Sequence, residues 1–271
     1  AWHRLRFHDG MALRAALMQK YEPRSVNRML SALRGTIETA IDLGLMDDGD
    51  GAWRIRMHGV KYDKHTLSGR ALEVDEVVKL MNVCDKKTLS GARDAALLAF
   101  LFGAALRRAE IAGIGMPNFD VATGRVRVIG KGAKKRTVQL PEDAADVVRG
   151  YIALRGNVDG PMLVSFTLQG ELRCDETGAP TGLTPSGVYD VLVTIAGRAD
   201  EAEPENSNAQ SHALTPHDAR RSRLTKMIAE GESLAFVKRV AGHESSETTD
   251  RYDQTKDELA HAASLRVSTF K

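Results

Sequence analysis

The 271-residue sequence predicts a mainly α-helical protein with a small antiparallel β-sheet or hairpin, arranged in two domains. Three observations carry this prediction. Residues 24–44 place apolar side chains at helical spacing, residues 58–70 form a polar stretch, and residues 124–140 alternate basic and β-branched side chains. We therefore expect a helical domain over 1–57, a linker over 58–70 and a larger, sheet-containing domain over 71–271.

The first domain is predicted to contain two helices. A shorter helical pattern covers residues 10–21, and a longer one covers 24–44, with Ser25 as a candidate N-cap and Gly44 where the helix would end. The apolar face of the longer helix consists of Val26, Met29, Leu30, Leu33, Ile37, Ala40 and Ile41.

The second domain is predicted to be helical around its sheet. Its first helix has acidic residues near its start, where the helix dipole favours them. The apolar run 92–114 predicts a buried central helix with a break near Gly103. Further helices are expected at 142–154, 185–198, 232–241 and in the tail 256–271, with a polar loop at 204–210.

Composition indicates a soluble, cytoplasmic protein. Hydrophobic residues make up 42% and charged residues 27% of the chain, and no apolar run approaches the roughly 18 residues of a membrane span. Cys84 and Cys174 lie far apart and show no CxxC spacing. A disulfide scaffold or a cysteine-based zinc site is therefore not expected.

Positive charge is concentrated locally, although the formal net charge is only +2. Residues 1–70 hold 12 Lys/Arg against 8 Asp/Glu, and residues 124–136 hold six basic residues and no acid. A basic stripe of this kind suits a phosphate backbone. A solvated basic hairpin is the alternative interpretation.

Two of four segments with candidate chemistry lie in the first half of the second domain. "LRRAE" places Arg107 and Glu110 after a buried helix, where an ion pair that stabilises the helix junction is the simpler explanation. "GKGAKKR" places Lys131 at a hairpin tip, either solvated or able to donate a proton in a groove. It is not a phosphate-binding P-loop, because GK[ST] is missing.

The other two segments lie near the end of the chain. In "LTPHDARRSRL", His217 and Arg220 share one face of a helix that starts at Pro216. In "GHESSETTDRYD", Gly242 is a natural helix cap, His243 follows it, and Tyr252 comes nine residues later. Surface exposure and ordinary packing are the alternatives, and the spacing of zinc ligands is absent.

Together these residue types suit phosphoryl transfer at a phosphodiester. Arginine stabilises charge on the non-bridging oxygens, and the reaction also needs a nucleophile, a proton donor and a proton acceptor. Since the sequence shows no metal site, cations of the protein would take the place of Mg²⁺.

The same residues, in the same order, resemble the tyrosine recombinases, the phage-integrase family. The family pattern has an arginine in G-L-R-x-x-E, a lysine in G-K-G-x-K-x-R, then H-x-x-R, G-H, and a tyrosine nine residues after that histidine. The chain differs in having Ala105 in the first box and "RVAGH" before the tyrosine segment. These small apolar changes are not expected to disable the neighbouring residues.

The resemblance implies an enzyme that acts without metal, ATP or another cofactor. It implies that Tyr252 attacks a scissile DNA phosphate to give a 3′-phosphotyrosyl intermediate, while Arg107 and Arg220 hold the non-bridging oxygens. The further implied roles are protonation of the leaving 5′-oxygen by Lys131, assistance to the tyrosine by His217, an oxygen contact by His243, and orientation of Arg107 by Glu110.

The resemblance also implies DNA integration, excision or resolution for a mobile element. Two domains would form a C-shaped clamp on double-stranded DNA with inverted-repeat core sites, as a homotetramer on two DNA sites, with an accessory DNA-bending or directionality factor in some systems. The candidate DNA contacts are Arg28, Arg34, Lys134, Lys135 and Arg136.

Three other functions compete with recombination. A type IB topoisomerase-like enzyme would use the same chemistry only to relax DNA, and the N-terminal helices and the basic hairpin favour recombination over it. A non-catalytic DNA-binding regulator derived from a recombinase is disfavoured because all six catalytic positions are filled. A phosphate-loop ATPase lacks its motif.

Overall fold

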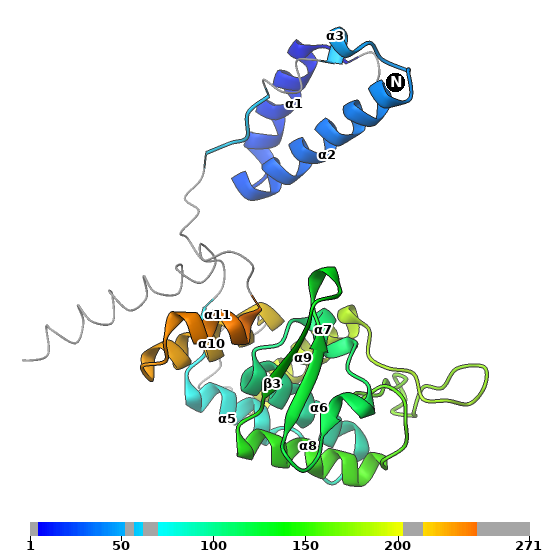
Figure 1. Cartoon of the computed structure of the whole chain (residues 1–271), viewed down its shortest axis with the longest axis vertical. Helices are drawn as coiled ribbons and strands as arrows, with labels where there is room; N and C mark the ends of the chain where they lie inside the picture. The colour runs from blue at the N-terminus through cyan, green and yellow to red at the C-terminus, as the bar shows by residue number, and fades with distance from the viewer. Residues whose placement is uncertain (1–4, 52–56, 62–69, 203–213, 243–271) are drawn as a thin grey trace, which may run out of the picture. The chain divides into compact units, whose positions relative to one another are not determined.

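The computed structural model describes residues 5–51, 57–61, 70–202 and 214–242. Over these ranges the protein is mainly helical with a small antiparallel sheet, which confirms the predicted fold class (Figure 1). The chain divides into two compact units, residues 1–66 and 67–271. No helix in the described ranges is long and apolar enough to cross a membrane.

The first unit is built on one amphipathic helix. Its elements are α1 (Phe7–Lys20), α2 (Pro23–Asp42) and the short α3 (Asp48–Gly51). Five of the seven residues on the predicted apolar face of α2 are buried, namely Val26, Leu30, Leu33, Ile37 and Ala40. The other two, Met29 and Ile41, are partly exposed. The predicted cap is wrong: Pro23 occupies the first turn and Glu22 the N-cap, so Ser25 lies inside the helix.

A polar side chain of α2 binds the backbone of Val60, near the end of the first unit. Asn27 donates from Nδ2 to the Val60 carbonyl (2.9 Å) and accepts from the Val60 amide (2.7 Å). Met57 is fully buried in the same apolar cluster. The first residues of the predicted linker therefore pack against α2.

The second unit surrounds a buried central segment. Helix α6 (Leu89–Leu98) continues as the π-helix η2 (Ala99–Gly103), and α7 (Arg108–Ala112) starts after a break. The predicted interruption near Gly103 is thus confirmed. The other helices of this unit are α5 (Val74–Asn82), η3 (Met116–Asn118), α8 (Glu142–Arg155), α9 (Pro185–Ala202), α10 (Pro216–Ala229) and α11 (Leu234–Ala241).

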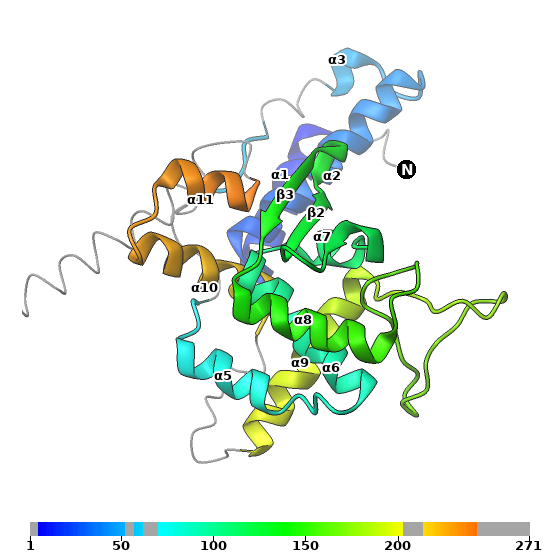
Figure 2. The ribbon, with the colours of Figure 1, turned by 60° about the horizontal axis from the view of Figure 1, so that its bottom comes forward.

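The sheet has the order β1-β2-β3 and is antiparallel throughout. Its strands are β1 (Phe119–Asp120), β2 (Arg125–Ile129) and β3 (Lys135–Gln139). Val126 pairs with Val138 and Val128 with Arg136, so inward-facing residues alternate with exposed ones. The turn η4 (Lys131–Ala133) joins β2 to β3 at the predicted hairpin tip (Figure 2).

Helices α10 and α11 pack on the end of the central segment. Both figures show them side by side, and their shared apolar cluster consists of Ala105, Leu224, Met227, Ile228, Val237 and Ala241. Ala105 belongs to the break before α7. This packing brings the break, α10 and the end of α11 together, although they are far apart in the sequence.

Candidate functional site

Helix α10 presents His217 and Arg220 in its first turns. Its start is fixed by a capping box, in which the Thr215 hydroxyl accepts from the Asp218 amide (3.3 Å) and the Asp218 carboxylate accepts from the Thr215 amide (2.9 Å). Pro216 occupies the first helical position, as predicted. The helix start therefore fixes the backbone from which both side chains extend.

Arg220 is almost fully buried, with 2% of its surface exposed. Its guanidinium donates to the backbone carbonyls of Ala105 and Ala241. Ala105 has a left-handed φ of 52°. A residue with a Cβ is strained in that conformation, whereas glycine, which stands here in the motif G-L-R-x-x-E, adopts it without strain.

Arg107 lies at the N-cap of α7 and shares Glu110 with Arg136. Its Nη1 donates to Glu110 Oε1 (2.8 Å) and its backbone amide to Oε2 (2.9 Å). Its Nη2 donates to the Gly242 carbonyl (3.1 Å). The Arg107 side chain keeps 39% exposure, so it faces solvent while two elements hold it.

Glu110 is the acidic centre of this cluster, with only 3% of its side chain exposed. Arg136 contributes a bidentate pair, from Nη1 to Oε1 (2.7 Å) and from Nη2 to Oε2 (2.9 Å). Burial alone would raise the pKa of Glu110, but the hydrogen bonds from Arg136 and Arg107 outweigh burial and lower that pKa to about 2.

The end of α11 joins the three arginines. Arg136, Arg220 and Arg107 donate to the carbonyls of Val240, Ala241 and Gly242, respectively. The last carbonyls of a helix lack intrahelical partners and carry partial negative charge, so they are natural acceptors for guanidinium groups. We refer to Arg107, Arg136, Arg220 and Glu110 as the arginine cluster; its formal charge is +2.

Gly242 is required at this helix end for two reasons. It has the predicted left-handed conformation (φ 60°, ψ 45°), and an added Cβ would lie 3.0 Å from Arg136 Nη1. Gly242→Ala is therefore expected to lower the free energy of unfolding of the second unit by about 1–2 kcal/mol in urea denaturation.

A second glycine-to-alanine change provides the matched control. Gly150 lies exposed inside α8 with nothing near its missing side chain, so Gly150→Ala should instead stabilise the unit by about 0.5–1 kcal/mol. A Gly242→Ala protein as stable as the original would show that the helix end does not need this conformation.

His217 is exposed, yet its surroundings disfavour a positive charge. Partial burial of the ring by protein atoms lowers the pKa of His217 below its ordinary value, and the nearby positive charge of Arg220 lowers it further. At neutral pH the imidazole is therefore mainly neutral and able to accept a proton.

The remaining predicted catalytic residues are placed only in part. The backbone of Lys131 lies at the hairpin tip, where the Gly130 amide donates to the Lys134 carbonyl (2.8 Å); its side chain is outside the described part of the molecule. His243 and Tyr252 also lie outside the described residues. The last described residue, Gly242, directly precedes His243.

The five predicted DNA contacts have different environments. Arg28, Lys134 and Lys135 are exposed. Arg34 is partly buried, and its Nη1 lies 3.5 Å from the Met57 carbonyl of its own unit. Arg136 differs most from the prediction, because it points inward to Glu110 and only 16% of its side chain is exposed.

Sequence reasoning missed the inward position of Arg136, although a signal existed. Strand residues two apart share a face, and Val138 is an obvious inward residue of β3, so Arg136 shares its face. The run of basic residues directed attention to phosphate binding instead. No local sequence pattern indicates that the carbonyls at the end of α11 accept hydrogen bonds from three arginines.

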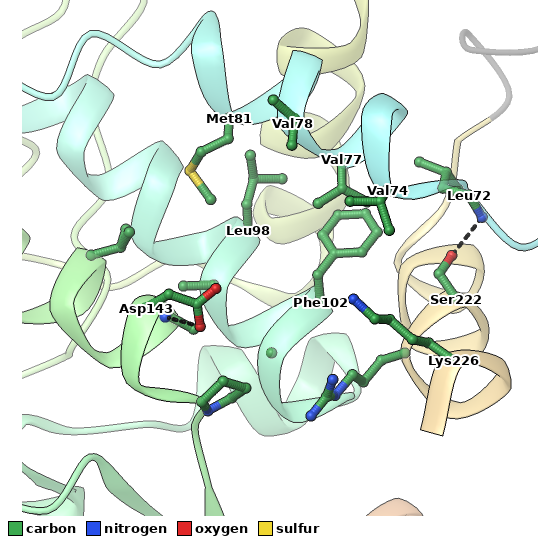
Figure 3. Close-up of a pocket in the computed structure, with 16 residues that line it drawn as sticks. Leu72, Val74, Val77, Val78, Met81, Leu98, Phe102, Asp143, Ser222 and Lys226 are labelled. Carbon is green, nitrogen blue, oxygen red and sulfur yellow. Dashed lines mark hydrogen bonds between the residues drawn. The ribbon is translucent and has the colours of Figure 1, made fainter. Parts of the chain in front are cut away.

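The described residues hold no group of three or more His, Cys, Asp or Glu side chains that could bind a metal ion. An apolar pocket of about 440 Å³ lies between α5, α6, α8 and α10, and Figure 3 shows Val77, Phe102 and Lys226 among its lining residues. Of the predicted site residues whose side chains the structure describes, none lines this pocket. The candidate site is therefore the arginine cluster with His217 and the hairpin tip.

Comparison with known proteins agrees with these motifs. A family model described as the phage integrase family matches residues 70–258. Tyrosine recombinase XerC of Myxococcus xanthus is 30% identical over 185 residues, which cover 68% of this chain and 58% of that protein. XerD of Listeria innocua is 28% identical over 251 residues, covering 90% of this chain and 74% of that protein. The chain thus spans less than two thirds of the length of the Myxococcus relative.

Solved structures share the fold at low sequence identity. The crystal structure of XerA recombinase has a TM-score of 0.55 at 19% identity, covering 97% of this chain and 84% of that one. A lambda integrase dimer bound to a COC′ core site has a TM-score of 0.63 at 14% identity, covering 92% and 80%. The Tn1549 transposon integrase in complex with transposon right end DNA gives 0.65 at 14%, covering 96% and 86%.

Proposed function

The chain belongs to the phage integrase family, and we propose that it is a tyrosine-type site-specific DNA recombinase. One observation supports this most strongly. Arg107 and Arg220 converge on consecutive carbonyls at the end of α11, and His243 and Tyr252 follow that end within ten residues of the sequence. The surplus positive charge of the arginine cluster suits a phosphodiester.

The proposed reaction exchanges one phosphoester for another. The Tyr252 oxygen attacks the scissile phosphorus, the bond from phosphorus to the 5′-oxygen breaks, and a 3′-phosphotyrosyl link forms. The tyrosine proton passes to His217, and Lys131 gives a proton to the leaving 5′-oxygen. Attack by the 5′-hydroxyl of another strand reverses these steps, so no ATP is consumed.

Arg107, Arg220 and His243 would stabilise the charge that develops on the non-bridging oxygens. Glu110 would orient Arg107, as its two hydrogen bonds to that residue suggest. The hydrogen bonds from the arginine side chains to backbone carbonyls would hold the guanidinium groups in place before DNA binds. Little reorganisation would then be needed during the reaction.

We also propose how the two domains and four copies of the protein act on DNA. Residues 1–57 would be the core-DNA-binding domain and 71–271 the catalytic domain, closing as a clamp on DNA through Arg28, Lys134 and Lys135. Four copies on two inverted-repeat sites would exchange strands for a mobile element, with an accessory DNA-bending or directionality factor where the site requires one. An enzyme acting on double-stranded DNA works where the DNA is, so we propose a cytoplasmic location.

The test uses nicked duplexes made from the DNA that flanks the gene. A covalent protein–DNA adduct should form on denaturing gels and be absent with Tyr252→Phe. Two differently labelled intact duplexes should then yield recombinant strands. Relaxation of supercoiled plasmid with no strand exchange would support a topoisomerase instead. Binding to the true site with no adduct would support a non-catalytic regulator.

The lowered pKa of His217 gives a pH dependence for this reaction. A base is active when deprotonated, so the single-turnover rate of adduct formation should rise with pH below about 6.5, the ordinary pKa of histidine, and then level off. In His217→Gln the rate should be lower and this rise should disappear. A rise retained in the variant would assign the titration to another group.

A further inference from the structure

On the basis of the proposed function, we propose that Arg136 is a positioning residue, which ties the Lys131 hairpin to Glu110 and to the end of α11. It acts through Arg107 and the end of α11, and it does not bind a DNA phosphate itself. It was predicted as a DNA contact because it ends a run of basic residues.

The orientation of Arg136 separates it from its basic neighbours. Lys134 and Lys135 are exposed, whereas Arg136 faces inward on β3 with Val138. Its pairing with Val128 in the sheet fixes that direction. Both terminal nitrogens of the Arg136 guanidinium donate to the buried Glu110 carboxylate, at 2.7 and 2.9 Å. The two nitrogens that would bind a phosphate are therefore already bonded within the protein.

The contacts of Arg136 join three parts of the candidate site. Glu110 Oε1 accepts from Arg136 and from Arg107, so one oxygen couples the two guanidinium groups. The Arg136 Nε donates to the Val240 carbonyl (3.3 Å), and the guanidinium lies against Gly242. The hairpin tip with Lys131 begins four residues before Lys135, the first residue of β3.

Loss of this fork should displace reacting groups without removing any of them. Glu110 would keep only Arg107 as its partner in the cluster, and the end of α11 would lose one of its three guanidinium donors. Because misplacement by about 1 Å can slow a reaction about 100-fold, we expect adduct formation to slow by about 10- to 100-fold. Lysine cannot reproduce two parallel hydrogen bonds, so Arg136→Lys should resemble Arg136→Gln.

The experiment measures two quantities on a core-site duplex: the affinity with its salt dependence, and the single-turnover rate of adduct formation at saturating DNA. Arg125→Lys is the matched control, since Arg125 is an exposed arginine at the far end of the same sheet. Positioning predicts that Arg136→Lys and Arg136→Gln lower the rate but keep the affinity and the salt slope. If Arg136 instead contacted DNA, Arg136→Gln would weaken binding and reduce the salt slope by about 1 while the saturated rate stayed normal.

Lys135→Gln provides the pattern of a phosphate contact for comparison, with weaker binding and a smaller salt slope. An Arg136 variant that behaves like this, or like the original protein in both measurements, overturns the proposal. If Arg136→Gln does not fold, the adduct-formation rate of Arg136→Lys tests the proposal by itself, because lysine retains the charge and most of the packing.

A second measurement needs no DNA and separates this proposal from the proposed function. In amide NMR spectra, Arg136→Lys should shift the Arg107 and Gly242 resonances, and Arg125→Lys should not. Shifts confined to the strand neighbours of residue 136 overturn the positioning role. Absence of any adduct with the unmodified protein would overturn the proposed function alone, and the spectra would still show whether Arg136 is coupled to Arg107 and Gly242.

Discussion

Replacing Arg220 with lysine is expected to slow DNA cleavage by about 100- to 1,000-fold, the loss typical of removing one preorganised donor from a site of developing charge. The guanidinium bridges two carbonyls, one at the break before α7 and one at the end of α11. A lysine ammonium group keeps the positive charge, but it lacks the planar guanidinium fork that reaches both carbonyls at once. The measurement is the single-turnover rate of adduct formation at saturating DNA.

Arg223→Lys is the control for this change. Arg223 lies one turn further along α10 and lines the apolar pocket rather than the arginine cluster. Its replacement should leave the cleavage rate near that of the original protein. Equal effects of the two substitutions would mean that α10 as a whole, and not the guanidinium of Arg220, supports the reaction.

Glu110→Ala is expected to have the largest effect on stability, lowering the free energy of unfolding of the second unit by about 3–5 kcal/mol. The carboxylate accepts from two arginine side chains and a backbone amide while almost fully buried. Its removal leaves the largely buried Arg136 guanidinium without its acidic partner. Urea denaturation measures the loss, and a loss below about 1 kcal/mol would contradict this account of the cluster.

The same residue gives a pH dependence of stability. The pKa of Glu110 is about 2 in the folded protein against an ordinary 4.5, so its stabilising effect is fully present above 4.5 and is lost as pH falls towards 2. Other carboxylates contribute to acid unfolding as well. The difference in stability between the original protein and Glu110→Ala should therefore shrink over this pH interval, and a constant difference would contradict the lowered pKa.

Local patterns in the sequence predict much of this fold correctly. The apolar face of α2, the break near Gly103, the hairpin around Lys131 and the left-handed Gly242 are all confirmed. Each depends on spacing or backbone preference over a few residues, which is the range in which sequence patterns carry information. Of the motif residues, the structure brings Arg107, Glu110 and Arg220 together around the end of α11.

Local sequence patterns could not predict the hydrogen bonds that connect the residues of the candidate site. Arg107 and Gly242 are 135 positions apart, and Arg136 and Val240 are 104 apart. These hydrogen bonds exist because α10 and α11 pack on the central segment, and that packing follows from the whole core. The positive φ of Ala105 is a similar case, since tertiary packing around Arg220 imposes a conformation that alanine alone would avoid.

The most direct test of the account is identification of the residue that becomes linked to DNA. The adduct formed on a nicked core-site duplex is digested with protease and nuclease, and the nucleotide-bearing peptide is sequenced by mass spectrometry. We expect a phosphodiester between Tyr252 and the 3′ end of the cut strand. Linkage through another residue, or to the 5′ end, would contradict it.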